Sequence, residues 1–168
     1  LAACNPDLAS LIDGTIGAGW KTELTQLEAL RSVAHDEGFQ AAWRDVKLAN
    51  NARLANDLES RTGLQVSTDK MFDIHVKRIH EYKLQLMNVL NEIHLFELIR
   101  RGEGECLVHR LFLIGGKAAP GYVMAKSVIK CINNVARVIN SDPAMKGRLQ
   151  LIFYPDYNVT GMEKICPA

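Results

Sequence analysis

The chain has 168 residues, of which 48% are hydrophobic and 23% charged, and its formal net charge is +1. This is the composition of an ordinary globular domain, and the length suffices for one sizeable hydrophobic core. The balanced charge argues against a nucleic-acid partner, and no apolar run approaches the length needed to cross a membrane. The four cysteines form no CxxC pair and no metal-binding spacing, so we expect no metal site and buried, reduced thiols in the cytoplasm.

The first third of the chain is predicted to be helical. Asn5 and Pro6 form a favourable helix start, because Asn caps and Pro fits the first helical position, and we expect this helix to end at Gly14. Leucines at three-residue intervals predict a second helix over 22–35. A third is predicted over 36–62, with Trp43 on its buried side, and 64–66 could add a short strand.

Strands and helices then alternate. Residues 72–76 alternate apolar and polar side chains, which is typical of a half-buried strand. No Pro or Gly interrupts the following segment, 81–101, which we predict to be a helix with Leu84, Met87, Leu90 or Val89, Ile93 and Leu95 on its apolar side.

The remaining elements repeat this order. A nearly continuous apolar run over 107–114 predicts a strand buried on both faces, followed by a helix over 123–140 and a strand over 149–154. Residues 163–168 are expected to form no further element. The alternation predicts βαβ crossovers and a parallel sheet, which is an α/β, Rossmann-like fold. We divide the chain into a helical preface, 1–66, and an incomplete Rossmann-like core, 67–168.

Charged and glycine-rich segments follow each predicted strand. These segments are Lys77-Arg78, Gly115-Gly116-Lys117 and 155–158. Open parallel sheets bind ligands beyond the carboxyl ends of their strands, and Lys, Arg and backbone N–H groups bind phosphate there. The sequence therefore predicts an anion-binding pocket without specifying a reaction. A solvated basic turn and a tight glycine turn remain the alternative interpretation.

Three longer stretches carry a resemblance to a known family. FDIHVKRIHEYK (72–83), IGGKAAPGY (114–122) and FYPDYNV (153–159) resemble the C-terminal domain of glycogen or α-glucan phosphorylases, and the resemblance spans essentially the whole chain. PDYNV is more similar to the bacterial and plant members. The resemblance implies one part of a two-domain GT-B glycosyltransferase. Such enzymes use pyridoxal 5'-phosphate and inorganic phosphate to release terminal α-1,4-linked glucose as glucose 1-phosphate.

The resemblance also implies roles for particular residues. Lys77, Arg78 and Lys83 would be catalytic, with Lys77 and Lys83 near the cofactor phosphate and Arg78 on the substrate phosphate. Tyr82 would contact a glucose hydroxyl and Tyr122 would lie at the mouth of the cleft. Tyr157 and Asn158 would lie near the cofactor.

The resemblance places the family's cofactor-linking Lys downstream of Ala168. We therefore expect the isolated chain to be inactive without the remainder of the phosphorylase. The resemblance also implies that the complete phosphorylase is a homodimer. Leu84, Gly161, Met162 and Cys166 depart from the family pattern and leave room for altered activity. Two other hypotheses remain. The chain could be a stand-alone Rossmann-like module that binds a nucleotide or sugar phosphate, or a structural domain whose basic turn is solvated.

Overall fold

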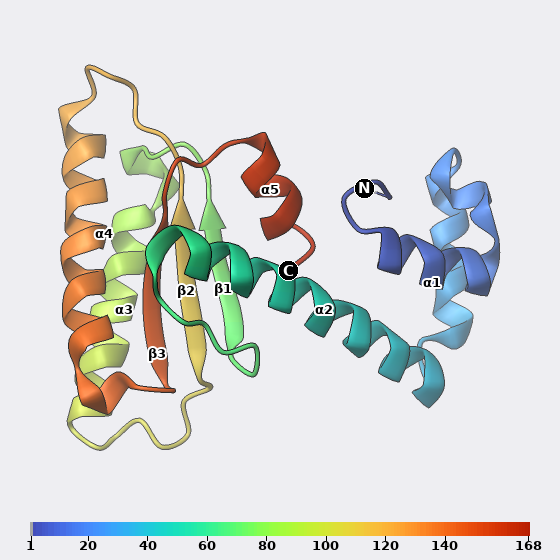
Figure 1. Ribbon diagram of the computed structural model, residues 1–168, viewed down its shortest axis with the longest axis horizontal. Coiled ribbons are helices and arrows are strands. Elements are labelled where there is room, and N and C mark those ends of the chain that lie inside the picture. The colour runs from blue at the N-terminus through green and yellow to red at the C-terminus, as the bar shows by residue number, and fades with distance from the viewer. Residues whose placement is uncertain (1) are drawn as a thin grey trace. The chain divides into compact units, whose positions relative to one another are not determined.

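The computed structural model describes residues 2–168, which cluster into two compact units. One unit comprises the chain up to Asp57 together with Val159–Ala168, and the other comprises Leu58–Asn158. Figure 1 shows the elements of both. No helix within residues 2–168 combines the length and the apolar character that a bilayer span requires.

The first unit is helical. It contains α1 (Pro6–Ile16), two 3-10 helices (Ala18–Lys21 and Leu24–Val33), α2 (Glu37–Thr62) as far as Asp57, and α5 (Val159–Ile165). Its small core is built on Trp20, Ala9 and Ile12. The Trp20 indole, buried there, donates its Nε1 hydrogen to Asp13 at 2.9 Å, so the ring is packed without an unsatisfied polar group.

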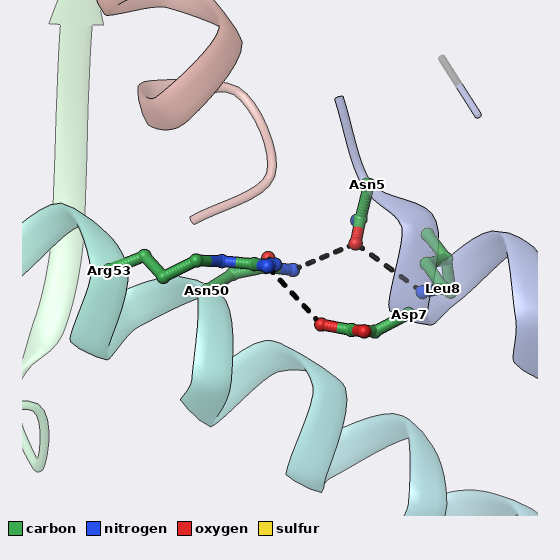
Figure 2. Close-up of polar contacts among 5 residues, drawn as sticks. All are labelled: Asn5, Asp7, Leu8, Asn50 and Arg53. Atoms are coloured by element: carbon green, nitrogen blue, oxygen red, sulfur yellow. Dashed lines mark hydrogen bonds and ion pairs between the residues drawn. The ribbon is translucent and has the colours of Figure 1, made fainter. Parts of the chain in front are cut away.

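The start of α1 is held to α2 by polar contacts (Figure 2). Asn5 Oδ1 accepts hydrogen bonds from the backbone N–H of Leu8 at 3.4 Å and from Asn50 Nδ2 at 3.2 Å. Arg53 pairs with Asp7 at 3.3 Å. The predicted N-cap therefore exists, and the same side chain also fixes the helix against its neighbour.

Several predictions for this unit need correction. Helix α1 passes Gly14 and ends at Gly17, whose φ of 82° suits only glycine. The second predicted helix is a 3-10 helix with no buried residue. Trp43 is 42% exposed rather than buried. The end of the chain, predicted to be irregular, contains α5, whose Lys164 pairs with Asp57.

The second unit contains three parallel strands in the order β1-β2-β3. They are β1 (Met71–Val76), β2 (Arg110–Gly115) and β3 (Leu149–Tyr154), connected by α3 (Gln85–Arg100) and α4 (Val123–Ser141). A short 3-10 helix, Pro143–Met145, precedes β3. The predicted parallel α/β sheet with helical crossovers is confirmed, although residues 64–66 form no strand.

Helices α3 and α4 cover the same face of this sheet (Figure 1). Between the layers lie Phe112 and Ile114 of β2, Leu151 of β3, Val89 of α3 and Ile132 of α4, all with exposed fractions near zero. Strand β1 has a sheet partner on one side only within the described chain. On this face it places Asp73 and His75 in register with Phe112 and Ile114. The sheet therefore presents polar groups to α3 along its edge strand.

The segment after β1 differs most from its prediction. The single helix expected over 81–101 is a 3-10 turn, Glu81–Lys83, followed by α3, with Leu84 between them at a φ of 61°. The predicted apolar side was wrong in part, because Leu84, Met87, Leu90 and Ile93 are exposed, whereas Leu95 and the alternative Val89 are buried as predicted. The buried side consists of Gln85, Val89, Glu92, Leu95, Phe96 and Ile99.

The cysteines also depart from expectation. Cys106 and Cys166 are exposed, and Cys4 and Cys131 are only partly buried. The predicted burial of all four side chains is therefore wrong.

Candidate anion-binding site

A cationic segment follows β1 at the carboxyl end of the sheet. We call Lys77–Lys83 the basic loop. Its backbone continues the β1–β2 ladder, since the N–H of Lys77 donates to the carbonyl of Gly115 at 3.0 Å and that of Ile79 to the carbonyl of Lys117 at 3.1 Å. The Ile79 side chain is 2% exposed and anchors the loop, whereas the side chains of Lys77 and Arg78 are exposed. The sequence prediction of cations at the strand end is thus realised by an extended, anchored loop.

Gly116 allows this loop to lie close to β2. A Cβ added at Gly116 would lie 1.9 Å from the carbonyl oxygen of Lys77, far inside van der Waals contact. Gly116 therefore permits close backbone approach, which was one of the two interpretations of this turn.

Gln85, the first residue of α3, holds the other side of the basic loop. It is 1% exposed. Its Nε2 donates to the carbonyl of Arg78 at 3.2 Å, and its Oε1 accepts from the N–H of His80 at 3.4 Å. Sequence analysis did not single out this residue, because a Gln at a helix start is normally read as exposed.

Positive charge at the strand ends is not compensated locally. Within residues 2–168, no carboxylate lies within ion-pair distance of Lys77, Arg78 or Lys117. Cationic side chains without a carboxylate partner can bind an added anion without first breaking an internal ion pair. This donor set suits phosphate.

An aromatic group lies beside the cations. The ring centre of His80 is 4.3 Å from that of Tyr82 and 4.9 Å from that of Tyr122. Tyr122 Oη donates to Glu81 at 2.5 Å, and this bond raises the pKa of Tyr122 because ionisation would lose it. Lys83 Nζ lies 5.5 Å from the centre of the Tyr82 ring, which is 70% exposed. The structure therefore brings Tyr82, Lys83 and Tyr122 together.

The segment after β3 reaches the same end of the sheet. Tyr157 packs edge-on against Tyr154, with ring centres 6.4 Å apart, and its Cδ2 would lie 3.5 Å from a Cβ added at Gly115. Asn158 Nδ2 donates to the carbonyl of Asp156 at 3.1 Å, within its own turn. Tyr157 thus borders the end of β2, while this bond of Asn158 stabilises the loop in which it lies.

The neutral form of a histidine next to the cations is favoured by its surroundings. Burial lowers the pKa of His75, and the charge of Lys77 lowers it further. His75 Nδ1 lies 3.5 Å from Asn88 Nδ2 on α3. No group of three potential ligands capable of holding a metal ion occurs among the residues that the structure describes.

The parallel sheet, the glycine turn and the cations without ion pairs define an α/β domain with a candidate anion-binding site at the carboxyl end of its sheet. Comparison with known proteins then identifies its family. The carbohydrate phosphorylase family matches the chain over residues 1–168, and the chain belongs to this family.

Individual relatives agree with this assignment. The chain is 47% identical over its full length to a glycogen phosphorylase of Chlamydia trachomatis, and it covers 20% of that protein. It is 46% identical over 164 residues to a glycogen phosphorylase of Synechocystis, covering 19% of it, and 44% identical over 168 residues to the brain form of Mus musculus, covering 20%. The chain thus spans about a fifth of the length of these relatives.

Proposed function

We propose that this chain is part of the C-terminal domain of an α-glucan phosphorylase. The complete enzyme would transfer the terminal α-1,4-linked glucose of a glucan to inorganic phosphate and release glucose 1-phosphate. The observation that carries the proposal is the uncompensated cation group, Lys77, Arg78 and Lys117, at the carboxyl ends of β1 and β2 in a chain of this family.

Arg78 is proposed to hold the substrate phosphate. Its guanidinium presents several N–H donors in a planar fork, which matches two oxygens of a phosphate. The backbone of Arg78 is fixed by Gln85 and flanked by ladder bonds on both sides, so the side chain extends from an ordered base. Such preorganised charge stabilises an anion without reorganisation of the protein.

The donor set also fits pyridoxal 5'-phosphate, the cofactor that the family resemblance implies. Lys77 and Lys83 would hold its phosphate, with Tyr157 and Asn158 beside it. When bound, the group would supply a second phosphate for acid–base exchange with the substrate phosphate. Two phosphates side by side repel each other, and Lys77, Lys83 and Arg78 would offset that repulsion.

Tyr82 and Tyr122 are proposed to face the glucose. Tyr82 is largely exposed beside His80, so its side chain would be accessible to a sugar. Tyr122 is restrained by its bond to Glu81 and would border the mouth of the cleft.

Other properties of the complete protein follow the same proposal. It would be a cytoplasmic homodimer, and the chain alone would be inactive, because the cofactor-linking lysine and the opposite wall of the cleft would come from the rest of the polypeptide.

The experiment that tests the proposal is Arg78→Ala in the full-length enzyme. We expect the phosphorolysis rate at subsaturating phosphate to fall by roughly a hundredfold or more, because a charge-assisted bidentate contact is lost. Arg101→Ala, which removes an exposed cation at the opposite end of α3, is the matched control and should leave phosphorolysis unchanged. Normal phosphate dependence in a folded Arg78→Ala enzyme would contradict the assignment.

A further inference from the structure

We propose that Gln85 is a positioning residue that sets the phosphate affinity of Arg78 by occupying the open edge of the basic loop. The inference rests on the proposed function, since it assigns phosphate binding to Arg78. Gln85 touches neither phosphate nor sugar in this account and acts through the backbone.

The geometry of an extended chain explains the role. Successive residues of a strand direct their backbone N–H and C=O groups to opposite sides. Lys77 and Ile79 direct their N–H groups toward the end of β2 and the segment after it, and bond to the carbonyls of Gly115 and Lys117. The groups of Arg78 and His80 therefore point away from β2.

On that side β1 has no neighbouring strand within the described chain. The Gln85 amide takes the place of a strand there, donating to the carbonyl of Arg78 and accepting from the N–H of His80. One planar amide thus satisfies the two backbone groups that bracket Ile79.

Burial makes this contact specific. Gln85 is 1% exposed at the start of α3 and its two bonds to the loop are partly buried, so loss of its amide leaves the two loop groups without these partners where access of water is restricted. The loop would keep its backbone bonds to Gly115 and Lys117, its buried Ile79 side chain and the contact of Glu81 with Tyr122. None of these replaces the bond to the Arg78 carbonyl. The backbone of Arg78 would then become more mobile, and the guanidinium would no longer extend from an ordered backbone position.

The test uses the full-length enzyme and the variant Gln85→Met, which keeps side-chain length but removes both hydrogen bonds. The KM for phosphate should rise roughly tenfold, the equivalent of one or two such bonds, while the KM for glucan stays within about twofold. A weaker affinity for phosphate with an unchanged affinity for glucan would distinguish a positioning role from general destabilisation of the fold.

Gln150→Met is the matched control. Gln150 is also buried and also makes two bonds, to the carbonyl of Gln65 at 3.0 Å and from Lys70 Nζ at 3.3 Å, but it lies at the amino end of β3. We expect this variant to lower the melting temperature to a similar extent without changing the KM for phosphate.

Gln85→Glu provides a second variant in case Gln85→Met fails to fold. An ionised carboxylate can accept from His80 but cannot donate to Arg78, whereas a protonated one can do both. At each pH, the KM for phosphate of Gln85→Glu is compared with that of the unmodified enzyme. The ratio of the two should therefore decrease toward one as the pH is lowered toward 5.

The outcomes separate the two claims. If Arg78→Ala leaves the KM for phosphate unchanged, the proposed function of the loop fails. If Arg78→Ala raises it but Gln85→Met behaves like Gln150→Met, or Gln85→Glu shows no recovery at low pH, the proposed function stands and the role of Gln85 is overturned.

Discussion

The amino-terminal end of α3 and its middle bury polar side chains with opposite consequences. Gln85 and Glu92 both lie on the buried side of the helix, with exposed fractions of 1% and 0%. The amide of Gln85 is bonded to the basic loop. Neither carboxylate oxygen of Glu92 has a hydrogen-bond partner among the described residues. One buried polar group is therefore hydrogen-bonded to a loop, while the other has no hydrogen-bond partner among the described residues.

The surroundings of Glu92 favour its neutral form. Burial and, to a smaller extent, the charge of Asp73 on β1 together raise its pKa to about 8. Arg110 Nη1 lies 3.7 Å from Asp73 Oδ2 and forms an ion pair there. Helix α4 presents only apolar buried residues to this layer, such as Ile132. At neutral pH the carboxyl is therefore mainly protonated.

This contrast shows that burial alone does not indicate a functional polar residue. Gln85 differs from Glu92 because its hydrogen-bond partners belong to the basic loop, which we propose to bind phosphate. Substitutions at Gly116, Glu92 and Leu84 test this difference.

The largest effect is expected at Gly116, which faces the same loop from the opposite side. Gly116→Ala should lower the free energy of unfolding by about 3 kcal/mol or more and abolish phosphate affinity, because the new Cβ would overlap the Lys77 carbonyl and displace the loop. Gly121→Ala is the control, since a Cβ there meets nothing within 4 Å and should change stability by less than about 0.5 kcal/mol. Chemical denaturation and phosphate titration measure both quantities. Equal effects of the two substitutions would contradict the close approach.

The second effect concerns Glu92 and pH. In the unfolded chain the carboxyl ionises near its ordinary pKa, whereas the folded chain keeps its proton until about pH 8. The folded state thus binds more protons between these values. The free energy of unfolding should fall by up to about 1.4 kcal/mol per pH unit as the pH rises toward 8, and this contribution should then level off.

Glu92→Leu removes this dependence and sharpens the contrast with Gln85. At pH 7 it should stabilise the fold by about 2–3 kcal/mol, because an ionisable group without hydrogen-bond partners is replaced by an apolar side chain of similar volume. The gain should shrink toward pH 4.5, where the carboxyl is largely protonated in both states. Denaturation at several pH values measures it, and a gain that does not vary with pH would show that Glu92 ionises normally in the folded protein.

The smallest effect is expected at Leu84, which joins the basic loop to α3 at a φ of 61°. Leu84→Gly should stabilise the fold by about 0.5–1 kcal/mol, because glycine adopts this conformation without strain and the exposed side chain contributes little packing. Leu90→Gly is matched in exposure but lies inside the helix, and it should destabilise by about 1 kcal/mol. Thermal melts distinguish the signs; destabilisation by both would show that Leu84 is not strained.

Much of the second unit could be predicted from sequence because its signals are local. The predicted strand 149–154 coincides with β3, and the helix over 123–140 ends one residue before α4 does. Strand β1 differs from its prediction by one residue. Continuous apolar runs and period-two alternation determine such strands without help from distant residues.

The buried side of α3 could not be predicted in the same way. Its sequence is apolar on more than one side, so periodicity does not identify the face that meets the sheet. Leu84 then separates the helix from the preceding turn, which a continuous apolar sequence conceals.

The site shows the same division. The strand-end position of Lys77 and Arg78 followed from chain order, and the structure brings Tyr82, Lys83 and Tyr122 together next to them. The position of Gln85 could not be predicted, because it fills the edge of β1 that has no neighbouring strand in the described chain, and only the folded chain shows this edge. The roles of all these residues toward phosphate, cofactor and glucose remain proposals.

The most direct test of the account is calorimetric titration of the 168-residue chain with inorganic phosphate, alongside Lys77→Ala/Arg78→Ala, after circular dichroism has verified that both chains are folded. Because the ladder bonds, Gly116 and Gln85 hold the basic loop in place, we predict saturable binding by the unmodified chain and loss of that binding in the double variant. A folded, unmodified chain that binds no phosphate, or equal binding by both chains, would contradict the claim that this loop is a preformed phosphate site.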